Sequence, residues 1–140
     1  MPIELRHIRF ECIEPILRIE SMATSLHFYV ELLGFHNAPW GNDGFTRVER
    51  DGRGLFLSVG EQGRGGAWVW VGVGDVDQLH RDWAARGVRI LVPPTNYPWA
   101  REMQVEDPDR NVLRVGSDLV TDDIEEEEDE PQAAEGGGAA

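Results

Sequence analysis

The sequence predicts an α+β fold in which two βαβββ modules form a curved mixed sheet. Each half of the chain contains one segment with helical spacing of apolar residues, preceded by one strand-like run and followed by about three more. The two helical segments also match in sequence, because Ser25-Leu26-His27 in the first corresponds to Gln78-Leu79-His80 in the second. Such self-similarity is typical of an internal repeat.

The first module is expected over residues 15–60. Residues 15–19 alternate in the manner of a strand, and Ser21 is placed to cap a helix that ends at Gly34. Two further strands are predicted at residues 45–50 and 54–59. The buried side of the helix is expected to be formed by Met22, Leu26, Tyr29 and Leu33.

The second module is expected over residues 67–117. A strand at 68–73 leads to a helix that starts at Asp75 or Asp77 and stops at Gly87. The turn Asp107-Pro108-Asp109-Arg110-Asn111 combines Asx side chains with a proline, which is the chemistry of a tight chain reversal. Strands are therefore predicted at 88–92, 99–106 and 112–116.

Both ends of the chain lie outside this repeat. Residues 1–14 form an N-terminal extension whose apolar residues could add a strand. Residues 118–140 form an acidic tail with too few apolar residues to bury, so we expect it to be disordered. Ten of the 26 acidic residues lie at or after Asp118, whereas all 13 basic residues come earlier. The tail therefore carries most of the net charge of −13.

Composition argues against several classes of function. A protein this acidic is a poor partner for nucleic acid, and no apolar run approaches the roughly 20 residues of a membrane span. Cys12 is the single cysteine, which rules out an internal disulfide and favours a reducing cytoplasm. We expect Cys12 to be a small buried hydrophobic residue rather than a nucleophile.

Several aromatic residues are placed to line a trough between the two modules. Each helix covers one face of its sheet, which leaves the opposite face for a ligand. Trp68 and Trp70 point to the same side of one strand and could serve the core or the trough. Trp99 follows the stiff pair Tyr97-Pro98 at the mouth of a strand, which favours ligand contact. Phe45 follows a flexible loop and could close over a planar ligand or plug the end of the sheet.

The repeat resembles the vicinal oxygen chelate, or glyoxalase-like, superfamily over residues 15–116. The resemblance is carried by Ser25-Leu26-His27-Phe28-Tyr29, by Gly74-Asp75-Val76-Asp77 and by the turn at 107–111. Two tryptophan-containing segments, 67–71 and 98–102, are similar to those of the bleomycin resistance proteins.

This resemblance implies a non-catalytic protein that confers resistance by sequestering bleomycin-type or similar aromatic antibiotics, with no cofactor. It implies a homodimer with exchanged N-terminal strands, hinged at Pro15, and one drug in each of two interface crevices. The flat part of the drug would stack between Trp99 and Phe45, beside Trp68 and near Ser58. Its cationic end would be drawn by carboxylates, for which Asp43 and Glu61 are the expected groups.

Many members of the superfamily are metal enzymes, so a metal-dependent lyase or dioxygenase is the alternative. Their four ligand positions correspond here to Glu14, to the strand around Leu57 and Ser58, to Trp68 and to Arg114. A set with one carboxylate, one hydroxyl, an indole and a guanidinium is too poor in donors for a divalent cation. We therefore expect no metal and no catalysis.

Some residues depart from the drug-binding pattern. Arg110 replaces the usual glycine of the turn, and Arg114 could place a positive charge near the crevice that repels a cationic drug. A module for another small molecule or a peptide therefore stays open as a third interpretation.

Overall fold

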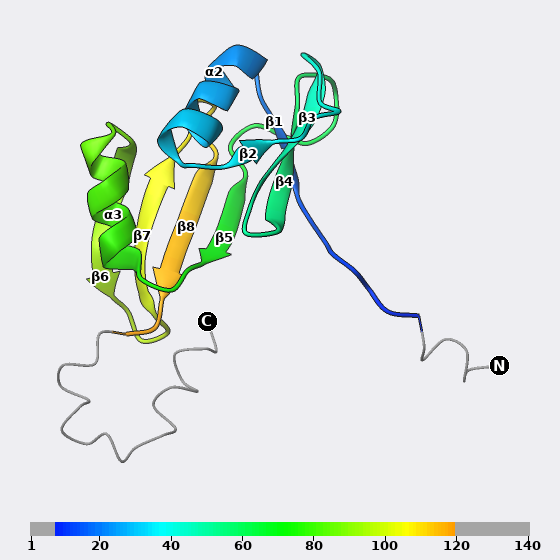
Figure 1. Cartoon of the computed structure of the whole chain (residues 1–140). Coiled ribbons are helices and arrows are strands. Elements are labelled where there is room, and N and C mark those ends of the chain that lie inside the picture. Colours follow the sequence, from blue (N-terminus) through cyan, green and yellow to red (C-terminus); the bar gives the residue numbers. More distant parts are fainter. Residues whose placement is uncertain (1–7, 120–140) are drawn as a thin grey trace, which may run out of the picture.

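The structure, a computed structural model, describes residues 8–119 and confirms the α+β fold with two βαβββ modules. Figure 1 shows the two modules beside each other, each with a helix next to its strands. The first module contains β1 (Ile16–Arg18), α2 (Met22–Leu26), the π-helix η1 (His27–Leu32), β2 (His36–Asn37), β3 (Phe45–Arg50) and β4 (Arg53–Ser58). The second contains β5 (Trp68–Gly72), α3 (Val76–Ala85), β6 (Arg89–Asn96), β7 (Arg101–Glu106) and β8 (Val112–Ser117).

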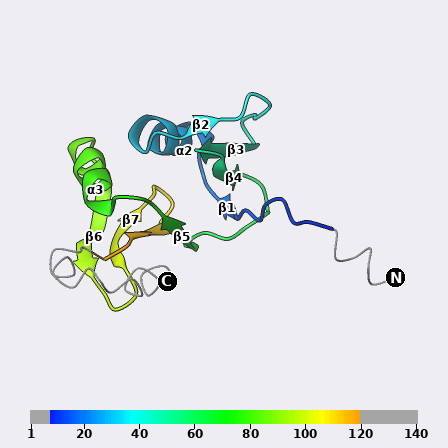
Figure 2. The same ribbon diagram turned by 60° about the horizontal axis from the view of Figure 1, so that its bottom comes forward.

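Each module forms its own four-stranded mixed sheet. The strand order is β1-β4-β3-β2 in the first sheet and β5-β8-β7-β6 in the second. In both sheets the first strand of the module runs parallel to the last one, and the remaining pairs are antiparallel. The identical order confirms the internal repeat. Figures 1 and 2 both place β5, an edge strand, on the side of the second sheet that faces the first module.

The first helix begins where the sequence predicts and then widens. Ser21 caps it, since its hydroxyl accepts a hydrogen bond from the backbone N–H of Thr24 at 3.1 Å. From His27 the helix has π geometry, and the N–H of Leu33 reaches back five residues to the carbonyl of Phe28 at 3.0 Å. The wider turn belongs to the segment that buries Phe28 and Tyr29.

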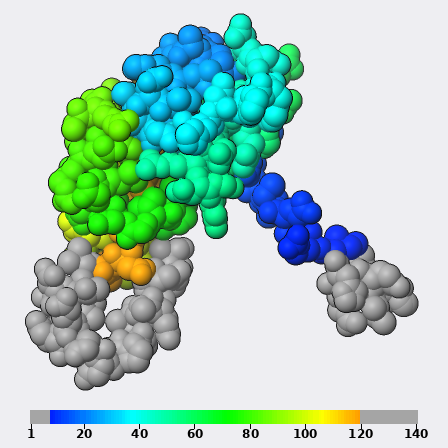
Figure 3. All heavy atoms as spheres, in the orientation of Figure 1, coloured from blue at the N-terminus to red at the C-terminus, as the bar shows by residue number. Residues whose placement is uncertain are grey.

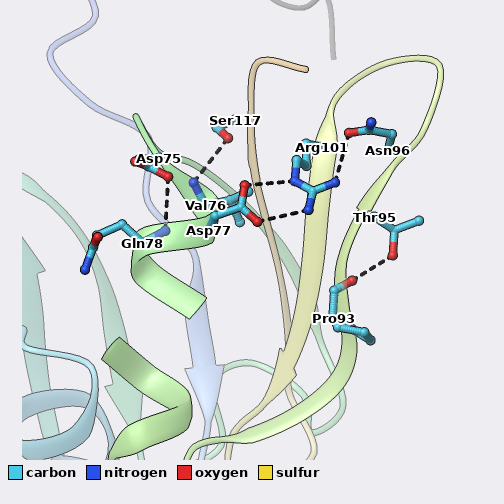
Figure 4. A network of polar contacts seen from close by, with 9 residues as sticks. All are labelled: Asp75, Val76, Asp77, Gln78, Pro93, Thr95, Asn96, Arg101 and Ser117. Carbon is cyan, nitrogen blue, oxygen red and sulfur yellow. Dashed lines mark hydrogen bonds and ion pairs between the residues drawn. The ribbon is translucent and has the colours of Figure 1, made fainter. Parts of the chain in front are cut away.

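The N-terminal end of the second helix is fixed by its own cap residue and by an arginine from the sheet. Asp75 caps it by accepting a hydrogen bond from the N–H of Gln78 at 3.0 Å. In the first turn, Asp77 accepts two hydrogen bonds from the guanidinium of Arg101 on β7, at 2.8 and 3.0 Å (Figure 4). Asn96 also accepts from Arg101, so this arginine joins α3 to both β6 and β7.

The hydrophobic core lies on the helix side of both sheets. Alternate residues of the second sheet, among them Leu113 and Val115, are buried on the side where α3 packs against β6, β7 and β8. Leu57 and Val48 play the same part in the first sheet. All these side chains belong to one continuous cluster, so the two modules share a core. The residues between them in sequence point to the uncovered faces.

The turn between β7 and β8 connects the second module to the first helix. Asp107 is buried, and its carboxylate accepts hydrogen bonds from the backbone N–H groups of Asp109 and Asn111, both at 2.8 Å. It also accepts from the side-chain amide of Asn111 and from the hydroxyl of Tyr29, each at 2.9 Å. Burial of its side chain raises the pKa of Tyr29 well above its ordinary value, and the neighbouring Asp107 carboxylate raises it further, so the phenol stays protonated.

The N-terminal segment leaves the body of the protein as an extended arm. Residues 8–14 form no strand with the rest of the described chain, and the space-filling view shows this segment standing away from the body (Figure 3). Phe10 and Ile13 are 80% and 83% exposed. Cys12 is exposed as well, so the expectation that it is buried was wrong, because the arm brings no packing partner to it. The added strand stays a prediction.

The expected disorder of the acidic tail concerns residues 118–140, of which residues 120–140 lie outside the described part. No helix among residues 8–119 is long and apolar enough to cross a bilayer.

Replacing Tyr29 with phenylalanine tests the link between the modules. Tyr29→Phe removes one of the four hydrogen bonds to the buried Asp107 carboxylate, so we expect a loss of about 1–3 kcal/mol in the free energy of unfolding. Urea denaturation measures it. Tyr97→Phe is the control, because the contact that the Tyr97 side chain makes is the stacking of its ring on Trp99, which a phenylalanine ring keeps. Equal stabilities for the two variants would contradict the role assigned to Tyr29.

Candidate functional site

Four of the five tryptophans are exposed, which is the most unusual feature of the surface. Trp40, Trp68, Trp70 and Trp99 are 56%, 61%, 41% and 39% exposed, whereas Trp83 is 2% exposed. Large aromatic side chains of a stable domain are usually more deeply buried, and an accumulation of them on a surface indicates a site of interaction.

The uncovered face of the second sheet carries two of them on β5. Cross-strand pairing places Trp70 beside Arg114 on β8, and Trp68 beside Val112. The guanidinium of Arg114 lies over the Trp70 ring, 5.3 Å from its centroid, which is the geometry of a cation–π contact. We call this the second open face, formed by Trp68, Trp70, Trp99, Glu102, Gln104 and Arg114.

A single carboxylate organises this face. Glu102 on β7 is only 2% exposed and accepts two hydrogen bonds from Arg114, at 2.6 and 3.0 Å. It also accepts the indole N–H of Trp99 at 2.8 Å. Hydrogen bonding to Arg114 holds the pKa of Glu102 below its ordinary value and outweighs the opposing effect of burial, so the group is charged at neutral pH.

The expectation about Arg114 changes. Arg114 is not a free cation in the crevice, because its charge is neutralised by Glu102 at hydrogen-bonding distance. The adjacent residues Arg101 and Glu102 lie on opposite faces, since Arg101 binds Asp77 at the helix and Glu102 binds Trp99 and Arg114 on the open side.

The ring of Trp99 is held on one side by Tyr97. Their centroids are 5.0 Å apart and their planes differ by 5°, so they are stacked. Since the N–H edge of Trp99 is engaged by Glu102, its remaining free surface is the ring face turned away from Tyr97.

The uncovered face of the first sheet carries a stack of three aromatic rings. Phe45 lies 5.3 Å from Phe56 and 6.3 Å from Trp40, with interplanar angles of 20° and 26°. Cross-strand pairing puts Arg18, Ser58 and Phe45 in one row of this first open face. Sequence reasoning overlooked Trp40, although its place directly before the Gly41-Asn42-Asp43-Gly44 loop was the available signal. Trp40 is the most exposed ring of the stack.

The polar residues predicted to contact a ligand differ in their exposure to solvent. Ser58 is buried, and its hydroxyl accepts a hydrogen bond from the N–H of Gly60 at 3.2 Å. Asp43 and Glu61 are exposed in loops at the end of the first module. Pro15 marks the start of β1, where its carbonyl accepts from the N–H of Phe56 at 2.9 Å. Their roles stay predictions.

The residues at the superfamily's metal positions do not fit a divalent cation. The Glu14 carboxylate accepts two hydrogen bonds from Arg47, at 2.7 and 2.6 Å, which lower its pKa and occupy its oxygens. Arg114 is itself a cation, and the indole of Trp68 offers no lone pair for a metal. Within residues 8–119, no three His, Cys, Asp or Glu side chains gather as a metal site.

One hollow lies away from the place where most of the exposed aromatic residues gather. It has a volume of about 1210 Å³ and lies between the N-terminal arm, the β3–β4 turn, β5 and α3. Of the residues predicted to contact a ligand, Trp70 alone lines it. Val69, Val71 and Leu79 contribute apolar surface, so the hollow runs along the helix side of the β5 edge.

Comparisons with known proteins bear on the family. A sequence profile described as "glyoxalase superfamily protein" matches residues 3–121. The solved structure of TnmS3, an antibiotic binding protein from Streptomyces sp. CB03234, is 24% identical with a TM-score of 0.68, covering 80% of this chain and 99% of that one. A bleomycin-binding protein from the bleomycin-producing Streptomyces verticillus, complexed with copper(II)-bleomycin, is 26% identical with a TM-score of 0.65, covering 79% and 98%.

A glyoxalase/bleomycin resistance protein/dioxygenase from Nocardioides is 21% identical with a TM-score of 0.64, covering 84% of this chain and 89% of that one. A search of curated protein sequences gives no significant match.

Substitution of two glycines, Gly116 and Gly72, tests how closely the Trp70 ring packs against the sheet. A Cβ added at Gly116 would lie 2.5 Å from Cη2 of Trp70, so Gly116→Ala must displace the ring and disturb its contact with Arg114. We expect altered near-ultraviolet circular dichroism and a loss of about 1–3 kcal/mol of stability. Gly72→Ala is the matched control, because its nearest contact is an ordinary 3.6 Å to Nε1 of the same ring. Unchanged spectra for Gly116→Ala would contradict the described packing.

Proposed function

Because the chain belongs to the glyoxalase superfamily, we propose that it is one of the non-catalytic binding proteins of that superfamily and sequesters an aromatic antibiotic of the bleomycin type or a similar natural product. The observation that carries the proposal is the gathering of exposed aromatic rings on both open faces. A protein of this kind needs no reacting group, since retention of the ligand is its whole activity.

Stacking explains why these faces suit a flat ligand. An aromatic pair contributes about 0.5–1.5 kcal/mol beyond the burial of its area, and each ring also removes apolar surface from water. Trp99 offers one ring face on the second module, and Trp40 offers the outer ring of the stack on the first. Phe45, the expected partner of Trp99, already stacks with Phe56 and Trp40. We therefore assign Trp40 a direct contact and Phe45 a supporting one.

The relatives support a small-molecule ligand. One similar structure is named as an antibiotic binding protein, and another, 26% identical, holds copper(II)-bleomycin. The donor set at the superfamily's metal positions does not fit a divalent cation, which favours binding over metal-assisted chemistry.

Charge affects which antibiotic can enter. Pairing of Arg114 with Glu102 removes the net positive charge that would repel a cationic drug from the second open face. Asp43 and Glu61 remain the groups proposed to attract its cationic end, since both are exposed in loops. An attraction of this kind weakens at high salt, because exposed charges are screened within about 10 Å at 0.1 M.

We further propose that the protein is a homodimer in which the N-terminal arms are exchanged. Phe10 and Ile13 on the arm are too exposed for a stable monomer surface, and Pro15 is the hinge at which the arm meets β1. The partner's arm would fill the hollow beside β5. Trp83 supports this idea, since it is one of the residues that line the hollow and its buried N–H has no acceptor within the described chain.

Titration of tryptophan fluorescence tests ligand binding. We expect copper-free bleomycin, or another glycopeptide or aromatic antibiotic from a panel, to quench the emission at micromolar or lower concentration. Trp99→Ala and Trp40→Ala should each weaken binding by about tenfold, because each removes a stacking surface. Leu91→Ala is the control, since Leu91 is also 39% exposed but has no aromatic ring.

Two results would contradict the proposal. Absence of quenching by every compound at stoichiometric protein would exclude antibiotic binding. About one divalent metal per chain in elemental analysis of the purified protein would instead favour the metal-dependent lyase or dioxygenase. Retained affinity in both tryptophan variants, with binding by the parent protein, would place the ligand elsewhere.

Light scattering after gel filtration tests the dimer. We expect twice the chain mass of 15.7 kDa for the full chain. Phe10→Asp combined with Ile13→Asp should give a monomer, because two charges cannot be buried against the apolar hollow. The exposed change Arg64→Asp in the loop between the modules should leave the mass unchanged. A monomeric parent protein would contradict the exchange.

A further inference from the structure

Two side chains of the second open face, Arg114 and Trp99, converge on one carboxylate, that of Glu102. Glu102 binds the guanidinium of Arg114 through both oxygens, and it binds the indole N–H of Trp99 at 2.8 Å. Arg114 in turn lies over the ring of Trp70. Trp70 is on β5 and Trp99 is in the loop between β6 and β7. The position of one ring relative to the other therefore depends on this carboxylate and on the sheet.

Burying the Glu102 carboxylate costs free energy, and the stability of the fold gives no reason for that cost. Removing an ion from water costs several kcal/mol, and an apolar pair of similar volume is often as stable as a buried ion pair. The side chain of Glu102 is 2% exposed, whereas that of its partner Arg114 is 36% exposed. The negative charge of Glu102 is therefore held beneath the aromatic surface, where it contacts both Trp99 and Arg114.

We propose that Glu102 is the positioning residue of the ligand-binding face. It orients Trp99 directly and Trp70 through Arg114, so that both rings have a fixed direction before a ligand arrives. This inference rests on the proposed function and adds to it the way in which the ligand is selected.

The arrangement determines what kind of ligand group the second open face accepts. The only polar atom of the Trp99 ring is engaged by Glu102, and one face of the ring is covered by Tyr97. Trp99 can therefore recognise a ligand by stacking on its free face and by no hydrogen bond. The part of the ligand that meets this face is a flat ring system, selected by its shape rather than by its donors and acceptors.

Preorganisation of the rings has a measurable consequence for affinity. Ordering one side chain on binding lowers affinity by an amount that corresponds to about tenfold at most. Glu102→Gln keeps an acceptor near Trp99 but loses the charge that binds Arg114, so both rings gain freedom. We expect the affinity for the antibiotic that quenches the parent protein to fall by about five- to tenfold.

A double-mutant cycle distinguishes positioning from a general structural effect. In the Trp99→Phe background, the phenyl ring has no N–H for Glu102 to bind, so Glu102→Gln should lower affinity by a smaller factor, about two- to threefold, which is the share that passes through Arg114 and Trp70. Glu106→Gln is the matched control, since Glu106 lies on the same strand and pairs with Arg89 at 3.2 Å. It should leave affinity unchanged in both backgrounds. An equal loss for Glu102→Gln with and without Trp99 would overturn the proposal, and so would no loss at all.

A measurement without ligand keeps this inference separate from the proposed function. In protein labelled with 5-fluorotryptophan, the fluorine resonance of Trp99 is assigned by its loss in Trp99→Phe. We expect Glu102→Gln to shift and broaden that resonance, and Glu106→Gln to leave it unchanged. If no antibiotic binds but the resonance responds in this way, the proposed function fails while the positioning stands. An unchanged resonance in Glu102→Gln would overturn the positioning.

A second variant covers loss of folding. Should Glu102→Gln leave Arg114 without a partner and fail to fold, Glu102→Gln with Arg114→Gln replaces the ion pair by two neutral amides. The same shift of the Trp99 resonance and the same dependence on Trp99 are expected for this pair, and their absence would overturn the proposal.

Discussion

The carboxylate of Asp107 is the contact on which the relation between the two modules depends. Each module has a complete sheet of its own, and within residues 8–119 no strand pairing joins them. Asp107 closes the β7–β8 turn and at the same time accepts the hydroxyl of Tyr29 from the first helix. Asn111 and Asp109 extend this contact to the N–H groups of Ala67 and Glu20. The direction in which each open face points is set by these hydrogen bonds and the shared core.

Strand β7 shows how the same short segment serves both sides of a sheet. Because side chains alternate, Arg101 reaches the N-terminal end of α3 while Glu102 reaches the open face. The first of these pairs stabilises the helix position, with Asp77 bound through both carboxylate oxygens. The second organises Trp99 and Arg114. The segment Trp99-Ala100-Arg101-Glu102 therefore contains one arginine that holds the helix and one carboxylate that belongs to the open face.

Sequence reasoning predicted the features that depend on neighbours in the chain and missed features that depend on distant residues. Strands 45–50 and 101–106, the Ser21 cap and the turn at 107–111 depend on neighbours in the chain, and all were predicted within a residue or two. The burial of Glu102 was missed because it depends on a contact with another strand, and the π-helical turn was missed as well. Arg114, which neutralises Glu102, is on the adjacent strand. Trp40 was overlooked because a loop tryptophan has no periodicity to reveal its face.

The two open faces differ although the modules repeat. The first presents a stack of aromatic rings, with Trp40 outermost, whereas the second combines tryptophans with an internally neutral ion pair. In the second face Arg114 binds Glu102 and lies over the ring of Trp70. Its charge therefore polarises the aromatic surface without adding net charge to it. The flat ligand of the proposed function would meet apolar rings at the first face and polarised rings at the second. The two modules thus share one strand order, and a few side chains make their open faces chemically different.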